Sequence, residues 1–368
     1  MRDTSTAFVT TTIHVPTFFD SYAEDAKRYK HTPVFIVIGD KKTPNETAVY
    51  CADLAARTGF RVEYFSIERQ EDYLKKFPAL RDHLPYNSVE RRNVGIVYAY
   101  ELGCETIIAI DDDNLRKSDD FLGGHDLAQA RECDIVSSST GWINVCKLIE
   151  EKHGRTFHHR GFPLEMRYED EVWTLEKRSI RPVVNAGLWL GDPDIDALTR
   201  LHHHTKPIEA ISHARERNIA AAHDTWTPFN SQNTAVRHDA IPAYFLSPTA
   251  QRFSDIWGAY CLKHIADHLG DHVAFGMPLV TQERNPHNSW RDFDNERYGL
   301  ALNVRFVDAL KRVSLTGADY LSCYAELAEK LPNAFLPEVK TADDERAFLD
   351  KYFEGMRVWR DTFASLTH

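Results

Sequence analysis

Short apolar runs alternate with segments of helical periodicity along the first third of the chain. The apolar runs predict strands over residues 7–15, 33–38, 60–67 and 106–110. Two segments, 45–58 and 91–102, repeat apolar residues at helical spacing and predict helices. Strands that alternate with helices predict an α/β fold, with a mixed and mostly parallel sheet covered by helices on both faces.

The pattern changes in the rest of the chain. Residues 187–190 predict one more strand, and residues 255–269 predict an amphipathic helix. From about residue 300 the pattern is helical, with breaks expected at Pro332 and Pro337. We therefore expect a catalytic α/β domain over residues 1–300 and a helical C-terminal extension over residues 301–368 that packs on it.

Composition narrows the class of protein. The chain has 368 residues, of which 43% are hydrophobic and 27% charged, which is ordinary for a soluble globular enzyme. Its net charge of -11 argues against a nucleic-acid binder, which needs a basic surface. No apolar run approaches the ~18 residues of a membrane span, and the N-terminus has no signal-peptide core. The six cysteines form no CxxC pair, so we expect buried free thiols and a cytoplasmic protein.

Three adjacent carboxylates, Asp111, Asp112 and Asp113, follow the apolar run 106–110. Like charges this close repel one another, and a bound divalent cation would offset the repulsion. A buried strand that ends in acidic side chains is also how an open α/β sheet presents a site. The alternative is a solvated turn, or a cap of the next helix like that offered by Asp119 and Asp120.

Basic and amide side chains stand at the start of the predicted helix before this strand. Arg92 and Asn93 lie near its N-terminus, where phosphate groups bind favourably. A metal held by the carboxylates would favour the same diphosphate. Together the two features describe a nucleoside-diphosphate site, although the arginines alone could be surface charges.

An Asp-x-Asp motif after an internal strand of such a fold resembles the GT-A glycosyltransferases. The resemblance implies a nucleotide-sugar bound through Mn²⁺ or Mg²⁺, with Asp111 and Asp113 as metal ligands. Further positions that match nucleotide-sugar contacts of such proteins are Thr11, Thr12, Asp40, Arg92, Asn93, Asp111, Asp112 and Asn233. The metal would offset charge on the departing nucleoside diphosphate.

A longer series of motifs resembles the reversibly glycosylated polypeptides, a family that includes the UDP-arabinopyranose mutases. In chain order these motifs are Arg92-x-x-Gly95, Asp111-Asp112-Asp113, Arg160-Gly161-Phe162-Pro163 with Arg167, Gly187-Leu188-Trp189-Leu190 with Pro193-Asp194, and Cys261-Leu262-Lys263-His264. The resemblance covers about residues 7–300, and such an ordered series is more specific than the acidic motif alone.

Two arginines of this series invite a catalytic role. The resemblance makes Arg160 the site of reversible self-glycosylation. A guanidinium stays protonated and is a poor nucleophile, so we favour an electrostatic role for Arg160 and Arg167, as donors to the diphosphate. The alternative is that both form salt bridges in a loop.

Asp255 stands at the predicted start of the helix 255–269. An acidic residue there resembles one that faces the acceptor in GT-A enzymes and removes its proton. The alternative is an acidic helix terminus stabilised by the helix dipole. A base at Asp255 would imply direct displacement with inversion, and without it a retaining or internal-return route stays open.

The chain departs from the mutase pattern at two positions. The metal-binding His of the mutases matches Gln282, and Phe162 stands in place of a Tyr. A nearby His287 is our candidate for the third metal ligand.

These observations lead to a functional prediction with two alternatives. We expect a metal-dependent glycosyltransferase that uses a nucleotide-sugar, expected to be a UDP-sugar, and an unidentified acceptor. The first alternative is a UDP-sugar pyranose/furanose mutase, and the second is a non-catalytic binder or self-glycosylated carrier. Association into a homo-oligomer is left open.

Overall fold

The computed structural model describes residues 6–214, 218–284, 288–335 and 343–366. In the described chain the strands are β1 (Thr6–Thr12), β2 (Val34–Gly39), β3 (Arg61–Phe65), β4 (Thr106–Ile110), β5 (Asn114–Arg116), β6 (Arg131–Ser138), β7 (Ile149–Glu151), β8 (Trp173–Ile180), β9 (Val184–Gly191), β10 (Ala210–His213), β11 (Ile219–Ala221), β12 (Asn233–Arg237) and β13 (Val273–Gln282). The helices are α1 (Phe19–Arg28), α2 (Glu46–Thr58), α3 (Ile67–Leu74), α4 (Pro78–His83), α5 (Arg92–Glu101), α6 (Phe121–Gly124), α7 (Ala197–His202), α8 (Ser254–Leu269), α9 (Ser289–Arg312), α10 (Tyr320–Phe335) and α11 (Asp343–Ala364).

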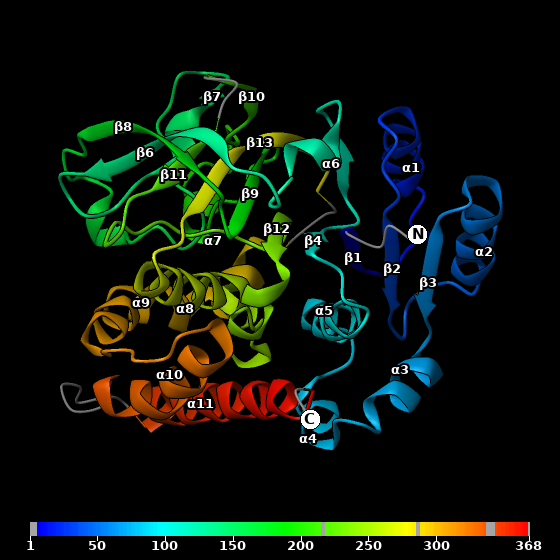
Figure 1. The fold of residues 1–368 in the computed structure, drawn as a ribbon. Helices are drawn as coiled ribbons and strands as arrows, with labels where there is room; N and C mark the ends of the chain where they lie inside the picture. The colour runs from blue at the N-terminus through cyan, green and yellow to red at the C-terminus, as the bar shows by residue number, and fades with distance from the viewer. Residues whose placement is uncertain (1–5, 215–217, 285–287, 336–342, 367–368) are drawn as a thin grey trace.

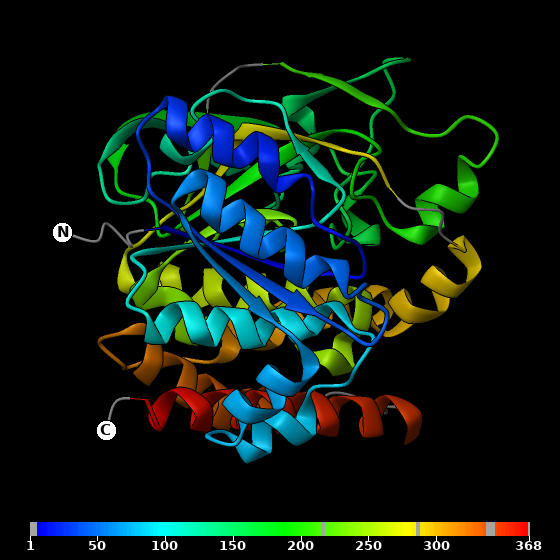
Figure 2. The same cartoon turned by 90° about the vertical axis from the view of Figure 1, so that its right-hand side faces the viewer.

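One half of the sheet is parallel and is covered on both faces. Its strands run in the order β3, β2, β1, β4, all parallel. Phe8 of β1 packs against Phe19 and Tyr22 of α1, with ring centroids 6.1 and 5.3 Å apart. On the opposite face Gly95 lets α5 approach β1, because a Cβ there would lie 2.6 Å from Val9. α1 and α5 therefore sandwich the sheet (Figure 2).

The other half of the sheet is mixed and begins at β12. This strand lies between β4 and β9 and is antiparallel to both. β9 pairs in parallel with β13, and the sheet continues through β11 and β6 to the edge strand β8. Figure 1 shows this half mostly in green, with β13 in yellow, beside the parallel half in blue and cyan.

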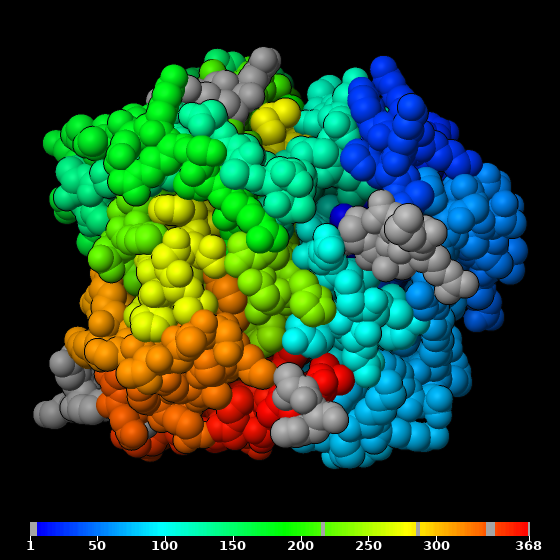
Figure 3. Space-filling model, viewed as in Figure 1, coloured from blue at the N-terminus to red at the C-terminus, as the bar shows by residue number. Residues whose placement is uncertain are grey.

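The C-terminal helices lie below the sheet in Figure 1 and pack on α8 and on the segment that follows β12. Trp257 of α8 stacks on Phe306 of α9 with a centroid distance of 4.2 Å, and Trp359 of α11 donates a hydrogen bond to the carbonyl of Pro242. α11 runs below α10 and ends beside α4 (Figure 1). In Figure 3 the orange and red atoms of these helices adjoin both the green and the cyan parts of the chain.

The predicted fold class is confirmed. The structure has a mixed α/β sheet flanked by helices, as in the GT-A fold, and a helical C-terminal region. The parallel pairings gather in the N-terminal half, where the alternation of strands and helices predicted them. The proposed division at residue 300 falls within α9, and it stays a proposal.

The sequence pattern predicted one helix break that is absent, and it missed several helices and strands. The break expected at Pro332 is absent, because this proline lies inside α10, in its last turn, where the missing N–H costs one helix hydrogen bond. Pro337 lies outside the described residues. The helices α1, α3 and α4 and the strand β8 were not predicted; α3 and α4 are short, and most of β8 is exposed.

The cysteine prediction is confirmed. All six cysteines are buried and none forms a disulfide. Within the described ranges, no helix combines the length and apolar character required to cross a bilayer.

Candidate active site

A cavity of about 410 Å³ opens where the parallel half of the sheet meets β12. The ends of β1, β2 and β4 supply one side of it, as expected for a site at the carboxyl edge of parallel strands. The start of α8, with the 3₁₀ helix η5 (Pro248–Phe253) before it, supplies the opposite side. Charged side chains line it on both sides: Asp40, Lys42, Arg92, Asp111, Asp112, Asp113, Arg160, Asp194, Arg252, Asp255 and Arg284.

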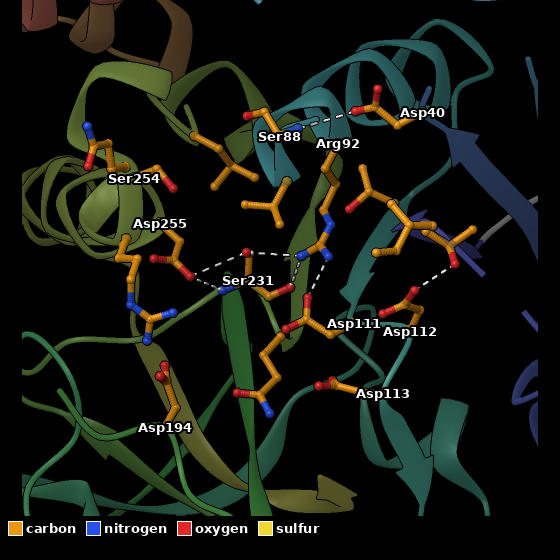
Figure 4. Close-up of a pocket in the computed structure, with 18 of the residues that line it drawn as sticks. Asp40, Ser88, Arg92, Asp111, Asp112, Asp113, Asp194, Ser231, Ser254 and Asp255 are labelled. Atoms are coloured by element: carbon orange, nitrogen blue, oxygen red, sulfur yellow. Dashed lines mark hydrogen bonds and ion pairs between the residues drawn. The ribbon is translucent and has the colours of Figure 1, made fainter. Parts of the chain in front are cut away.

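The first wall contains the residues predicted to hold the nucleoside. Thr11 and Thr12 lie at the end of β1, and the Thr12 hydroxyl donates a 2.6 Å hydrogen bond to Asp112. Asp40 follows β2 and accepts a hydrogen bond from the backbone N–H of Ser88. The four predicted positions, Thr11, Thr12, Asp40 and Asp112, all line the cavity, as does Ser88. Figure 4 shows Asp40, Ser88 and Asp112 on this side of the cavity.

Arg92 lies at the centre of the cavity. It is the first residue of α5, where the helix dipole disfavours a cation, and the Asp111 carboxylate compensates by accepting its hydrogen bond. The same guanidinium donates to the hydroxyl and the carbonyl of Ser231. Arg92 is 2% exposed, so it is a fixed cation in the cavity wall rather than a surface charge.

The charge of Asp113 is only partly compensated, by the nearby cation Arg284. Among the described residues, its Oδ1 atom is buried without a hydrogen-bond partner, and its Oδ2 atom accepts only a 3.4 Å hydrogen bond from Gln282. Burial, together with the neighbouring Asp111 carboxylate, raises the pKa of Asp113 to about 6. Burial also raises the pKa of Asp111, although Arg92 opposes this rise.

These two carboxylates fit a divalent cation. Hard cations take oxygen ligands, and Mg²⁺ is commonly held by one or two carboxylates with phosphate oxygens completing its coordination. The unpartnered Oδ1 atom of Asp113 is a donor of this kind. Within the described residues no group of three His, Cys, Asp or Glu side chains could hold a metal alone. The predicted ligand His287 lies outside the described residues.

Arg160 is held between two carboxylates. Its Nε and Nη2 atoms donate to the two oxygens of Asp194, both at 2.9 Å. Its Nη1 and Nη2 atoms donate to the two oxygens of Asp255, at 3.0 and 3.2 Å, and Nη1 also donates to the carbonyl of Arg252. All five N–H groups of the guanidinium are therefore engaged. Burial alone would lower the pKa of Arg160, but the two carboxylates raise it well above its usual value.

Asp255 is equally well satisfied. Oδ1 accepts from Arg160 and from its own helix at Ile256 N, and Oδ2 accepts from Arg160 and from Ser231 N at 3.0 Å. Its position in the first turn of α8 confirms the predicted helix start and is favourable for an acidic residue. Both oxygens already accept charge-assisted or backbone hydrogen bonds, so a ligand hydroxyl would have to displace one of these donors to reach the carboxylate.

Three predicted site residues lie behind the cavity and do not line it. Arg167 binds Asp196 and Thr199 at the start of α7. The Asn93 amide donates to the carbonyl of Leu246, which is itself a lining residue. The Asn233 amide donates to Pro278 O, and its Oδ1 atom bonds His125. These contacts give all three a structural role, and their part in catalysis or binding stays a prediction.

Four charged residues of the cavity, Lys42, Asp194, Arg252 and Arg284, were missed from the sequence. Asp194 follows β9, and Arg284 follows β13, so both obey the rule that located the acidic motif after β4. Burial would raise the pKa of Asp194, but Arg160 and His159 hold it well below its usual range. Burial lowers the pKa of Arg284. Its Nε atom lies 3.1 Å from Oδ2 of Asp192, and its Nη2 atom donates a hydrogen bond to the side-chain oxygen of Gln282. Arg284 thus approaches the acidic motif through Gln282.

Comparison with known proteins places this chain in a family. The model of the family described as "Reversibly glycosylated polypeptide" matches residues 53–366. UDP-arabinopyranose mutase 1 of Arabidopsis thaliana is 25% identical over 215 residues, which cover 56% of this chain and 54% of that protein. UDP-arabinopyranose mutase 1 of Oryza sativa subsp. japonica is 25% identical over 233 residues, which cover 61% of this chain and 60% of that protein. The chain thus spans little more than half the length of the curated relatives it matches. Because the family model covers most of its residues, the chain belongs to the reversibly glycosylated polypeptide family.

Proposed function

We propose that this protein is a UDP-sugar mutase that interconverts the pyranose and furanose forms of a sugar while the sugar stays paired with UDP. Relatives with this activity in their names support the choice of reaction and of a UDP-linked substrate. The cavity supports the choice of ligand, because an acidic motif that fits a metal stands beside a fixed arginine, Arg92. The mutase thus replaces the glycosyltransferase, which the sequence favoured, as the first candidate function.

We prefer the mutase over the transferase because both carboxylate oxygens of Asp255 are already hydrogen-bonded. A transferase with direct displacement needs a base to remove the acceptor proton. Asp255 is the candidate base, yet Arg160, Ser231 and Ile256 already occupy both of its oxygens. A mutase needs no external acceptor, because the product is an isomer of the substrate and UDP recaptures the sugar.

Residues on the two sides and at the centre of the cavity have different roles in this proposal. Thr12 and Asp40 on the first wall bind the nucleoside, and Arg92 at the centre orients the diphosphate through charge-assisted hydrogen bonds. Asp111 and Asp113 would hold the divalent cation, which when bound supplies charge compensation for the departing diphosphate. The unit formed by Arg160, Asp194 and Asp255 gives the opposite wall a fixed shape against which the glycosyl ring rests.

A fixed wall has a chemical purpose in this reaction. While the bond between the sugar and the diphosphate is broken, water competes with UDP for the sugar. A rigid, hydrogen-bonded wall keeps the sugar close to UDP and leaves little room for water. Arg160 acts here as a positioning residue, through the two carboxylates that it orders.

Glycosyl transfer to an acceptor is the second candidate. One observation favours it, since Ser254 and Asp255 both line the cavity at the N-terminus of α8, where an acceptor hydroxyl would meet them. Transfer would require Asp255 to exchange one of its present hydrogen bonds for the acceptor.

Product analysis separates the two functions. The protein is incubated with UDP-arabinopyranose and Mn²⁺, and the nucleotides are resolved by chromatography, with and without a panel of acceptor sugars. A new UDP-arabinose isomer without free UDP supports the mutase. Free UDP that appears only with an acceptor supports transfer and overturns the mutase proposal. Neither product, despite binding of the UDP-sugar, would leave a non-catalytic binder.

A further inference from the structure

Gln251 combines three features on the wall of the cavity that faces Asp40 and Asp112. It lines the cavity, its side chain is exposed there, and its carboxamide has no hydrogen-bond partner within the described part of the chain. A carboxamide offers two N–H donors and one acceptor oxygen, which matches the donor and acceptor character of sugar hydroxyls. Gln251 thus brings unused hydrogen-bonding capacity to the side of the cavity where Arg160, Asp194 and Asp255 are paired with one another.

The backbone of Gln251 adopts a conformation that suits glycine. Its φ of 49° and ψ of -122° match the first central position of a type II′ turn. Residues with a Cβ rarely occupy this region, whereas Asn and Asp tolerate the left-handed helical region, with positive ψ, far better. Backbone strain of this kind persists where the surroundings fix it, and it gathers at binding and catalytic sites.

The residues around Gln251 fix this conformation. Ala250 is buried on one side, and on the other the carbonyl of Arg252 accepts a hydrogen bond from Arg160. The Arg252 side chain donates to Glu296 of α9 at 2.7 Å. Phe253 packs so closely on α9 that a Cβ on Gly299 would lie 2.1 Å from its ring. With both neighbours held, the chain must turn at residue 251, and glycine would make this turn with less strain.

The position of Gln251 in the cavity indicates whether it would contact the nucleoside or the glycosyl group of a bound nucleotide-sugar. In Figure 4, Arg92 and Asp111 lie between Asp40 and Asp112 on one side and Ser254 and Asp255 on the other. A diphosphate bound at Arg92 therefore directs its nucleoside to the first side and its glycosyl group to the second. Gln251 precedes Ser254 by three positions and belongs to the second side.

We propose that Gln251 contacts the glycosyl ring of the bound nucleotide-sugar through hydrogen bonds from its carboxamide and thereby helps to select the sugar. This inference rests on the proposed UDP-sugar substrate and adds a specificity-determining residue to it. The side chain is the reason that a strained glutamine occupies a position where glycine would fit the backbone.

Three substitutions separate the side chain from the backbone. Gln251→Ala removes the carboxamide and keeps the Cβ at positive φ, Gln251→Gly removes both, and Gln251→Glu keeps the size but loses the N–H donors. Calorimetry with MnCl₂ measures the affinity of each variant for UDP and for UDP-arabinopyranose. We expect all three to bind UDP as the wild type does, and to bind UDP-arabinopyranose at least about fivefold more weakly.

Thermal unfolding adds a second measurement. Gln251→Gly should unfold at a higher temperature than Gln251→Ala, because glycine adopts positive φ without strain. The matched control is Lys30→Gly, at an exposed residue with φ of 64° outside the cavity, which should leave both affinities unchanged. Higher thermal stability with weaker sugar binding in Gln251→Gly is the combined result that supports the inference.

Other outcomes overturn it. Variants that bind UDP-arabinopyranose as tightly as the wild type show that Gln251 does not contact the sugar, and the proposed function stands. Equal losses for UDP and UDP-arabinopyranose place Gln251 against the nucleotide and likewise refute the sugar contact. A wild-type protein that binds neither ligand overturns the proposed function and this inference with it.

Discussion

Arg160 and Asp194 form a two-pronged ion pair in which Nε and Nη2 each lie 2.9 Å from a different carboxylate oxygen. Asp255 completes the arrangement from the other side of the guanidinium. All three side chains are at least 89% buried, so their charges compensate one another with little help from water. This unit links the loop before α7 to the start of α8, two segments that the chain brings together only when it is folded.

Removing Arg160 should destabilise the protein strongly. Arg160→Met leaves two buried carboxylates without their cation, which typically costs about 3–5 kcal/mol of unfolding free energy. Urea denaturation followed by circular dichroism measures this loss. The control is Arg178→Met, which breaks an exposed pair with Glu176 and should cost far less unfolding free energy than Arg160→Met. Equal small losses in both variants would contradict the importance of the buried unit.

The folded protein should not become glycosylated on Arg160. All five N–H groups of its guanidinium are engaged and its pKa is raised, so no neutral nitrogen is available as a nucleophile. Intact mass spectrometry after incubation with UDP-arabinopyranose and Mn²⁺ should show an unmodified chain. A mass increase of one pentosyl group that peptide mapping assigns to Arg160 would refute this prediction, and would favour the self-glycosylated carrier.

Asp113 should control the effect of metal on nucleotide binding. Asp113→Asn keeps the shape of the side chain but removes the charge of the unpartnered oxygen. We expect Mn²⁺ to tighten UDP binding to the wild type at least about tenfold and to have little effect on the variant. Titration calorimetry at zero and saturating Mn²⁺ provides the comparison, with Asp119→Asn at an exposed aspartate as the control. A variant that keeps the full Mn²⁺ effect would remove Asp113 from the proposed metal site.

His125 should make stability depend on pH in the acidic range. It is buried, with Nε2 bonded to Asn233 and Nδ1 to Asn185, and burial lowers its pKa to about 3. Below about pH 6.5 the unfolded chain therefore binds a proton that the folded chain refuses, and stability falls with falling pH until about pH 3.

The variant His125→Gln removes this proton linkage. Between pH 6.5 and 4.5 the wild type should lose about 2 kcal/mol more unfolding free energy than the variant, as measured by urea denaturation at each pH. His202→Gln, at an exposed histidine, should follow the wild-type curve. Parallel curves for the wild type and His125→Gln would show that the buried imidazole does not drive the pH dependence.

The pattern of apolar and polar residues was enough to predict the strands that carry the site and the side of the cavity at their carboxyl ends. Thr12 ends an apolar strand, and Asp40 and Asp111 each directly follow one. Parallel strands place their carboxyl ends at one edge of the sheet, so the proximity of these residues follows from the sequence. The opposite wall is different, because Arg160 and Asp255 meet across 95 positions of sequence. No periodicity encodes such a contact, because the pairing of Arg160 with two acids forms only when distant segments of the chain fold together.

The positions of Asn93, Asn233 and Arg167 show the same limit. Motif order suggested that each faces a ligand, whereas each is bonded to a backbone or side-chain partner behind the cavity. A polar residue within a motif can serve the ligand or support the wall, and only its hydrogen-bond partners distinguish the two roles. The strain at Gln251 also has no signature in the sequence, because glutamine is not a residue that marks turns.

The position of β12 in the sheet determines the order in which the site can be assembled during translation. Asn114, just after the acidic motif, donates a hydrogen bond to the carbonyl of Gln232, 118 positions later, and β12 then pairs antiparallel with β4. A nascent chain that has emerged only as far as α6 already contains the three carboxylates but lacks the strand that closes the cavity. Ligand capture should therefore wait until β12 and the start of α8 have left the ribosome, and a chain that stops before β12 should not compete for the nucleotide.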